Sequence, residues 1–260
     1  MPAMTRLIYF SPTSTTKKIV EQIAVGFGDT SVTHHDLTRL REGLNLRLGD
    51  GLAIIGVPVY AGRVPEICLE RLDGLSASSV PAVLVVLYGN RAFEDALIEL
   101  RDVVVAKGFA VIAAGAFIGE HSYSTTTQPV AAHRPDLADL AKARKFGSLI
   151  ASRLRDGIGA ALPVIPGDLP YKERMSLGGV APETDPGLCT LCGTCASLCP
   201  TFVIRVDDRV LTDAERCLKC CACTKGCPPG ARTLHHPTVD ARREMLVNQC
   251  SERKEPALFL

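Results

Sequence analysis

Two cysteine runs near the C-terminal end carry the clearest chemical signal in this sequence. They are Cys189-x2-Cys192-x2-Cys195-x3-Cys199 and Cys217-x2-Cys220-x2-Cys223-x3-Cys227, each followed by proline. Thiolates at this spacing wrap three corners of an iron–sulfur cubane, and the fourth cysteine stands off on a short helix. Zinc sites rarely need a third cysteine at this spacing, and chance pairs of disulfide cysteines would not repeat it. The runs therefore predict two 4Fe–4S clusters.

The ligand sets follow from the bacterial two-cluster ferredoxins, which have this spacing and in which the fourth cysteine of each run binds the other cluster. By that rule one cluster is held by Cys189, Cys192, Cys195 and Cys227, and the other by Cys217, Cys220, Cys223 and Cys199. Cys221 could also reach a cluster edge, but the repeat favours Cys220 and leaves Cys221 as a packing residue. Cys68 and Cys250 have no partner pattern and are expected to be buried, inert thiols.

The first part of the chain alternates apolar runs with amphipathic stretches, which predicts the elements that position a second site. Strands are expected at 7–10, 31–37, 51–57, 81–88 and 109–119, and helices at 15–27, 93–107 and 135–155. Continuous apolar runs such as 51–57 suit parallel strands that are buried on both faces. The pattern predicts an α/β fold with a doubly wound, five-stranded parallel sheet.

Composition divides the chain into four parts. Residues 1–156 form the sheet domain, 157–186 a Pro/Gly-rich ordered linker, 187–234 a small α+β domain with the cysteines, and 235–260 a helix and tail that dock on the body. We expect the linker to be ordered because Leu162, Val164, Ile165 and Leu169 need burial. The net charge of +1 gives no nucleic-acid or membrane signal. Eight cluster cysteines and no leader sequence predict a cytoplasmic protein of an organism living with little oxygen.

The segment after the first strand is a candidate phosphate site. Ligands of a doubly wound sheet sit at the carboxyl ends of its strands. Here the residues are Ser11-Pro12-Thr13-Ser14-Thr15-Thr16, at the start of a helix. Hydroxyls and N–H groups at a helix N-terminus bind anions. The chain lacks a Walker lysine pattern and a Gly-x-Gly-x-x-Gly motif, which disfavours triphosphates and dinucleotides. A merely capped helix in a Ser/Thr-rich turn is the alternative.

Three further loops lie at the same edge of the predicted sheet, and with the phosphate loop they carry a family resemblance. They are Pro58-Val59-Tyr60-Ala61-Gly62-Arg63-Val64-Pro65, Tyr88-Gly89-Asn90-Arg91 and Gly119-Glu120-His121-Ser122-Tyr123. The phosphate loop and the first two loops resemble those of flavodoxins, except that Ser14 replaces a glycine of the phosphate loop. As a whole the chain resembles bacterial flavodoxin–ferredoxin fusion proteins. The resemblance implies an FMN-binding, flavodoxin-like domain joined to a two-cluster ferredoxin domain.

The resemblance also suggests roles for individual residues. Ser11, Thr13, Ser14, Thr15 and Thr16 would hold the FMN phosphate. Tyr60, or alternatively Tyr88, would stack on the flavin ring, and backbone groups of Ala61, Gly62, Gly89 and Asn90 would bond its polar edge. Arg63 and Arg91 would stabilise the reduced ring or solvate the loop rim. His121 and Tyr123 are candidate catalytic residues, because a histidine beside a flavin can gate proton uptake near neutral pH.

Together these sites predict an electron-transfer protein, because one-electron clusters are joined to a flavin that takes one or two electrons. The partner would be a ferredoxin, a flavodoxin or an oxidoreductase, and a homodimer is possible. Alternatively, the clusters feed a flavin-dependent reductase of a small-molecule acceptor, and the Glu120–Tyr123 loop distinguishes the two. A redox sensor is a weaker alternative, since no DNA-binding helix pair or basic patch accompanies the clusters.

Overall fold

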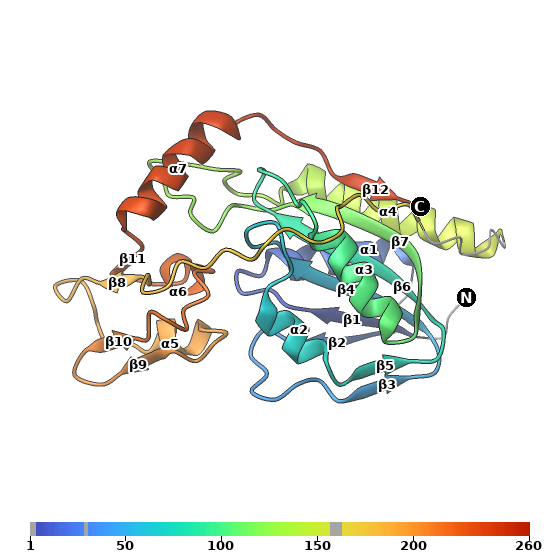
Figure 1. Cartoon of the computed structure of the whole chain (residues 1–260), viewed down its shortest axis with the longest axis horizontal. Helices are drawn as coiled ribbons and strands as arrows, with labels where there is room; N and C mark the ends of the chain where they lie inside the picture. Colours follow the sequence, from blue (N-terminus) through green and yellow to red (C-terminus); the bar gives the residue numbers. More distant parts are fainter. Residues whose placement is uncertain (1–3, 29–30, 157–162) are drawn as a thin grey trace.

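A twisted parallel sheet forms the centre of the larger half of the molecule (Figure 1). The computed structural model describes residues 4–28, 31–156 and 163–260. The parallel strands are β1 (Thr5–Tyr9), β2 (Val32–Asp36), β4 (Leu52–Pro58), β6 (Val80–Tyr88) and β7 (Phe109–Ile118). Their order is β7-β6-β4-β1-β2, which is the flavodoxin-like order of a doubly wound sheet. The predicted fold class is confirmed.

Helices cover both faces of this sheet, and the strand sequences show why. In β1, Leu7 packs with α1 (Thr15–Phe27) and α4 (Leu137–Arg155) in one apolar cluster. Its neighbour Ile8 belongs to the cluster on the opposite face, which includes residues of α2 (Glu66–Leu72) and α3 (Ala96–Ala106). Successive side chains of a strand point to opposite faces, so a strand that is apolar at every position needs a cover on each side.

Several short elements escaped the sequence prediction. These are β3 (Leu46–Leu48), β5 (Leu75–Ala77), α2 and the edge strand β12 (Ala257–Phe259). β12 pairs antiparallel with β7, so the main sheet has six strands among the described residues rather than the five expected. Strands of three residues contain too few alternating positions to give a periodic signal. α4 begins at Leu137 because the Asp136 carboxylate caps it, accepting from the Asp139 N–H at 3.0 Å.

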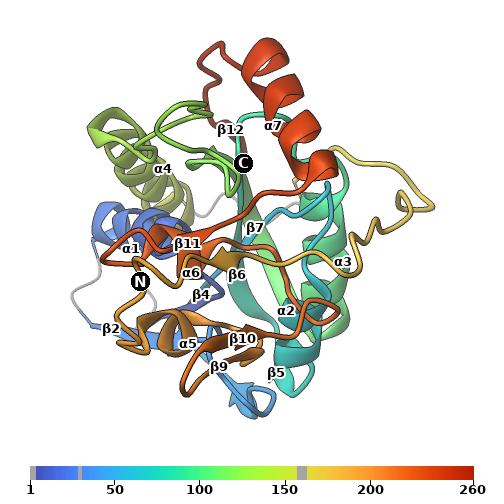
Figure 2. The ribbon, with the colours of Figure 1, turned by 90° about the vertical axis from the view of Figure 1, so that its left-hand side faces the viewer.

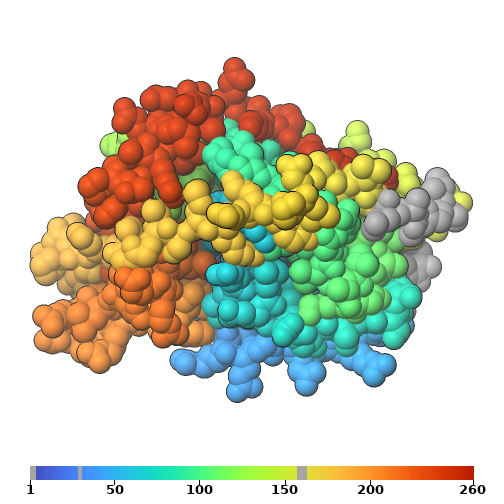
Figure 3. Space-filling view, viewed as in Figure 1, coloured from blue at the N-terminus to red at the C-terminus, as the bar shows by residue number. Residues whose placement is uncertain are grey.

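The segment after α4 crosses one side of the molecule towards the cysteine-rich half, as the yellow band of Figure 3 shows. Residues 157–162, including Leu162, lie outside the described residues. The prediction that Val164 and Leu169 are buried is wrong, because they are 91% and 65% exposed; Ile165 is buried. Polar contacts with α3 hold the segment instead. Asp95 accepts from the N–H groups of Asp168 and Lys172, at 2.9 and 2.8 Å.

The cysteine-rich half is a small unit that faces the viewer in Figure 2. Its elements are β8 (Glu183–Thr184), α5 (Thr194–Leu198), β9 (Ile204–Val206), β10 (Val210–Thr212), α6 (Ala222–Lys225) and β11 (Arg232–Thr233). β8 pairs antiparallel with β11, so Glu183 and Thr184, which precede the predicted boundary at residue 187, contact this unit.

The C-terminal segment returns from the cysteine-rich half to the sheet. Helix α7 (Pro237–Gln249) is followed by the strand β12 at the sheet edge (Figure 1). Arg243 of α7 donates to the carbonyl oxygen of Tyr123 at 2.8 Å, and Arg134 donates to the carbonyl oxygen of Lys254 at 3.0 Å. Among the described helices, none has the length and apolar character needed to cross a membrane.

Candidate cofactor sites

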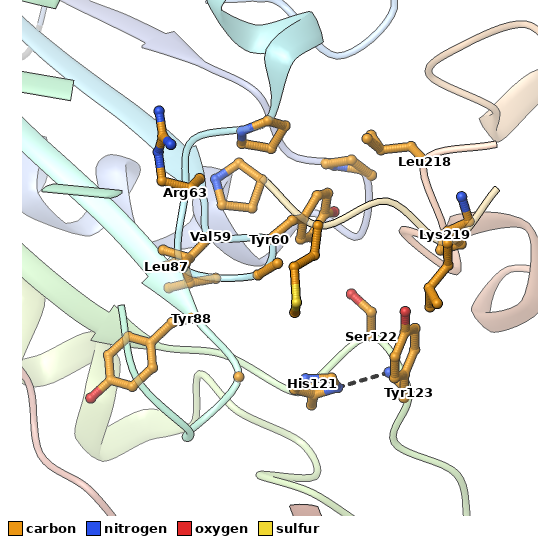
Figure 4. A pocket seen from close by; sticks show the side chains of 18 of the residues that line it. Val59, Tyr60, Arg63, Leu87, Tyr88, His121, Ser122, Tyr123, Leu218 and Lys219 are labelled. Atoms are coloured by element: carbon orange, nitrogen blue, oxygen red, sulfur yellow. Dashed lines mark hydrogen bonds between the residues drawn. The ribbon is translucent and has the colours of Figure 1, made fainter. Parts of the chain in front are cut away.

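A cavity of about 1010 Å³ lies between the two halves of the chain, at the carboxyl ends of the parallel strands. The sheet domain contributes the loops after β1, β4, β6 and β7, and the cysteine-rich half contributes Cys217, Leu218 and Lys219. In Figure 4, Leu218 and Lys219 approach the cavity from the side opposite Val59 and Leu87. The volume is at the upper end of ordinary small-molecule sites. The four loops singled out in the sequence thus share one cavity.

The predicted phosphate loop forms one end of this cavity. Thr13, Thr15 and Thr16 line it, and the hydroxyls of Thr13 and Thr15 lie 3.2 Å apart at the start of α1. Ser11 is turned inward, where its hydroxyl accepts from the Lys17 N–H at 3.0 Å. Ser14 has φ 61°, so it adopts the left-handed backbone that a glycine would adopt freely. Hydroxyls and first-turn amides at a helix N-terminus suit a phosphate.

The loop after β4 is a tight turn that places Tyr60 in the cavity. Tyr60 and Arg63 exchange N–H···O hydrogen bonds of 3.0 and 3.1 Å, with Ala61 at φ 51° and Gly62 at φ 83° between them. These signs are typical of a type I′ turn. A Cβ on Gly62 would lie 1.7 Å from a Glu94 carboxylate oxygen, so both backbone and space require glycine there.

Arginine side chains predicted beside the flavin ring have other partners. Arg63 forms a two-pronged ion pair with the buried Glu99, at 2.7 and 2.9 Å, and Arg91 pairs with Glu94 at 2.6 Å. In Figure 4 the Arg63 guanidinium points away from His121 and Tyr123. The positive charges of Arg63 and Arg91 are thus largely compensated within the protein.

The loop after β6 presents backbone rather than side chains to the cavity. Tyr88 is buried, packs against Phe93 with ring centroids 5.6 Å apart, and points away from the cavity in Figure 4. The Asn90 amide donates to the carbonyl oxygens of Cys250 and Glu252, each at 2.7 Å. Gly89 and Arg91 line the cavity. Of the two tyrosines predicted to stack on a flavin, the Tyr60 side chain faces the cavity and the Tyr88 side chain does not.

The loop after β7 places His121, Ser122 and Tyr123 along one wall (Figure 4). The His121 Nδ1 accepts from the Tyr123 N–H at 3.0 Å, so a neutral ring carries its proton on Nε2. Burial, reinforced by the charges of Lys225, Arg91 and Arg243, lowers the pKa of His121 to about 4. His121 is therefore a neutral donor at physiological pH, and the expectation that it gates protons near neutral pH does not fit this environment.

Glu120 connects the same loop to the cysteine-rich half. Its carboxylate pairs with Lys225 of α6 at 2.5 Å. Burial raises the pKa of Glu120, but the hydrogen bond and charge of Lys225 outweigh burial and lower it overall. Glu120 thus stays charged and holds the two halves together.

Sequence reasoning missed several residues of this cavity. The linker contributes Lys172, Arg174 and Met175–Leu177, and α7 contributes Arg242, Met245 and Leu246. No motif marks them, because they reach the cavity only through the way in which the linker and α7 fold back.

A second, smaller cavity marks one of the predicted cluster sites. Five cysteines line it: Cys221 and the four ligands predicted for the second cluster, which are Cys199, Cys217, Cys220 and Cys223. Burial raises the pKa of the Cys220 thiol well above its ordinary value and that of Cys217 and Cys223 less strongly. Buried thiols of this kind ionise when bound iron compensates the charge. The donor set therefore fits an iron–sulfur cluster.

Among the described residues, no three His, Cys, Asp or Glu side chains converge closely enough to hold one metal ion. Each thiolate around a cubane binds a different iron, so its four ligands need not converge on a point.

The two cysteine runs share a backbone geometry. Residues with positive φ recur 28 positions apart as Leu191 (53°) and Lys219 (55°), as Gly193 (77°) and Cys221 (59°), and as Phe202 (55°) and Gly230 (69°). Cys221 therefore occupies the place of Gly193 in the repeat, whereas Cys220 is the counterpart of Cys192. Cys221 is buried and packs with Val180, Leu234 and Val239.

The other predicted cluster site is nearer the surface. Cys192 is exposed, and Cys189 and Cys227 are half-buried. Leu188 and Leu191 beside them are 52% and 43% exposed. The two predicted sites therefore differ in position, one facing the cavity and the other facing solvent.

Known proteins are similar to parts of this chain. The 4Fe-4S binding domain family matches residues 182–205. A flavodoxin from the domain Archaea is 14% identical, with 58% of this chain and 99% of that chain aligned and a TM-score of 0.41. The flavodoxin of Fusobacterium nucleatum bound to flavin mononucleotide is 18% identical, with 60% and 99% aligned and a TM-score of 0.39. No curated protein matches the chain significantly.

The strand order and the cysteine-rich unit define the class of protein. The chain has an N-terminal flavodoxin-like domain and a C-terminal 4Fe–4S ferredoxin domain. The resemblance to flavodoxin–ferredoxin fusions is confirmed for these two domains. The combination of a flavodoxin-like domain with a 4Fe–4S domain suggests electron transfer.

Proposed function

We propose that this protein is an iron–sulfur flavoprotein that transfers electrons between two 4Fe–4S clusters and FMN bound in the large cavity of the same chain. The observation that carries the proposal is the composition of the cavity wall. Thr13 and Thr15 of the phosphate loop, Tyr60 of the ring loop and Cys217 of the second predicted cluster all line it. A 4Fe–4S cluster carries one electron at a time and FMN takes one or two, so together they convert between the two kinds of chemistry.

The residues of the chain have distinct roles in this proposal. Thr13, Thr15 and the first-turn amides of α1 bind the phosphate, and Tyr60 stacks on the ring. Burial raises the pKa of the Tyr60 phenol well above its ordinary value, and the thiols of Cys220 and Cys68 act in the same direction. Tyr60 therefore stays protonated. The exposed site at Cys192 is where a redox partner protein would exchange electrons with the chain.

Cofactor analysis of anaerobically purified protein tests this function. We expect about eight iron, eight acid-labile sulfide and one FMN per chain. Thr13→Val combined with Thr15→Val should lower FMN content and leave iron unchanged, whereas Cys217→Ala should lose about four irons and keep FMN. Full clusters in a protein that binds no FMN would leave only a ferredoxin function, and iron bound as a single ion would contradict the cluster assignment.

A reductase is the second candidate, and the size of the cavity favours it. With about 1010 Å³, the cavity is at the upper end of the range for small-molecule sites, and His121, Ser122 and Tyr123 face it (Figure 4). The neutral His121 can donate from Nε2 to an acceptor bound against the flavin. Replacing His121 with Ala should leave FMN reduction by the clusters intact and abolish acceptor turnover. Absence of turnover by the wild-type protein with a broad set of quinone, nitro and enone acceptors would leave the carrier function.

A further inference from the structure

Arg232 is a buried cation that has no carboxylate partner among the described residues. It lies on β11 and is 4% exposed. The buried arginines Arg134 and Arg243 pair with Asp139 and Asp240, and Arg71 donates to three carbonyl oxygens. A buried charge without a counter-ion strongly destabilises a fold unless another group compensates it.

The donors of Arg232 converge on the site of the second predicted cluster. Its Nη1 donates to the Thr184 hydroxyl at 2.7 Å, and its Nη2 donates to the Thr212 hydroxyl at 3.0 Å and lies 3.7 Å from the Cys223 sulfur. The Nε–H is buried and has no partner in the described part of the chain. Among the residues described around the small cavity, Arg232 is the charged one. The Nη2 donor of Arg232 thus already reaches the predicted ligand Cys223, and the Nε–H remains available to a sulfur of the cluster.

Among the described residues, no charged side chain hydrogen-bonds a cysteine of the first predicted cluster, although the Arg232 charge also acts on Cys195, where it opposes the rise in pKa that burial causes. The side-chain partner of Cys192 is neutral: the Thr194 hydroxyl lies 3.3 Å from the Cys192 sulfur. Cys192 is exposed, so water screens nearby charge there much more than at the buried Cys223. Reduction adds one negative charge to a cluster, and hydrogen bonds to sulfur and low solvent exposure set how readily that charge is accepted.

We propose that Arg232 hydrogen-bonds a sulfur of the cluster held by Cys199, Cys217, Cys220 and Cys223 and raises its reduction potential relative to the other cluster. Electrons delivered by a partner at the exposed cluster then collect on the cluster beside the cavity. This inference rests on the ligand assignment in the proposed function. Arg232 acts through the cluster and is a positioning residue, because it does not contact the flavin loops.

Redox titration monitored by electron paramagnetic resonance tests the proposal on the anaerobic holoprotein. In Arg232→Gln, the equilibrium constant for reducing the second cluster should fall at least tenfold, which is about 59 mV for one electron. The first cluster should shift less. The matched control is Arg205→Gln, which removes the same charge from the 71% exposed Arg205 of β9, and it should move neither potential appreciably. Unchanged potentials in Arg232→Gln, or equal shifts of both clusters, would overturn the proposal.

Arg232→Lys keeps the test decisive if the glutamine variant fails to assemble. Lysine retains a charge and a donor but not the planar fork, so we expect a smaller shift of the same sign. If the lysine variant holds both clusters and its second cluster has the wild-type potential, the planar guanidinium of Arg232 is not required. The iron and sulfide content of the wild-type protein tests the ligand assignment separately from the role of Arg232. If the protein holds fewer than about eight iron atoms, the ligand assignment fails, whatever the effect of the Arg232 variants.

Discussion

At the scale of single residues, Cys221 shows how the repeat distinguishes a ligand from its neighbour. It has φ 59° where the first repeat has Gly193 at 77°, so its backbone position suits glycine. We expect Cys221→Gly to keep about eight iron atoms and to change the free energy of unfolding by about 1 kcal/mol or less, because relief of the left-handed backbone offsets lost packing. Cys220→Ala should lose about four irons. Iron analysis and thermal melting of both variants check this, and the reverse pattern would make Cys221 the ligand.

His121 gives a pH dependence whose sign follows from its environment. Burial lowers the pKa of His121 to about 4, whereas the unfolded chain titrates near 6.5. Between these values the unfolded state binds more protons, so this contribution to stability is complete above pH 6.5 and is lost as the pH falls towards 4. The melting temperature should therefore fall less from pH 7 to pH 5 in His121→Gln than in the wild type. Nuclear magnetic resonance should show the His121 ring neutral at pH 6, and a midpoint between pH 6 and 7 would contradict the argument.

At the scale of elements, the C-terminal segment fixes a loop of the cavity. Asn90 has φ 65°, and its amide donates to carbonyl oxygens of residues 250 and 252 ahead of β12. Asn90→Ala removes both hydrogen bonds and leaves buried carbonyl groups unpaired, which should weaken FMN binding about tenfold. Flavin fluorescence quenching measures the affinity. Asn248→Ala, on the exposed face of α7, is the control, and equal affinities in both variants would show that the tail does not position the loop.

The elements also show what the sequence could predict. Apolar runs such as Leu52–Pro58 and the helix Thr15–Phe27 were predictable, because burial on both faces and helical periodicity are local properties. β12 was not, because its three residues become a strand only through pairing with Ala114–Ala116 of β7. The exposure of Val164 and Leu169 was equally hidden, since Asp95 at the N-cap of α3 and Glu99 within α3 hold that segment by polar contacts. Cavity residues such as Arg242 could not be predicted either, because they reach the cavity only where the C-terminal part of the chain folds back onto the sheet domain.

At the scale of the whole molecule, the placement of the two halves depends on a few contacts far apart in sequence. Arg71 of α2 donates to the carbonyl oxygen of Pro200 at 2.7 Å. Two guanidinium groups lie over the ring of Phe202, with Arg39 at 5.1 Å and Arg41 at 4.3 Å from its centroid. The second repeat has Gly230 at the corresponding position, so the left-handed backbone of Phe202 is retained where the aromatic ring docks on the flavodoxin-like half. These contacts hold the second predicted cluster against the cavity of its own chain.

Under the proposed function, this docking predicts electron transfer within one chain. After flash reduction of the exposed cluster, the rate of flavin reduction should not change when the protein is diluted tenfold. Phe202→Ala removes both cation–π contacts, each of about 0.5–1 kcal/mol or more, and should slow the transfer by loosening the docking, with iron and FMN contents unchanged. Leu211→Ala, an exposed position on β10, is the control and should keep the wild-type rate. A rate that rises in proportion to protein concentration would instead require a second chain to supply the cluster, and a homodimer would then be the functional unit.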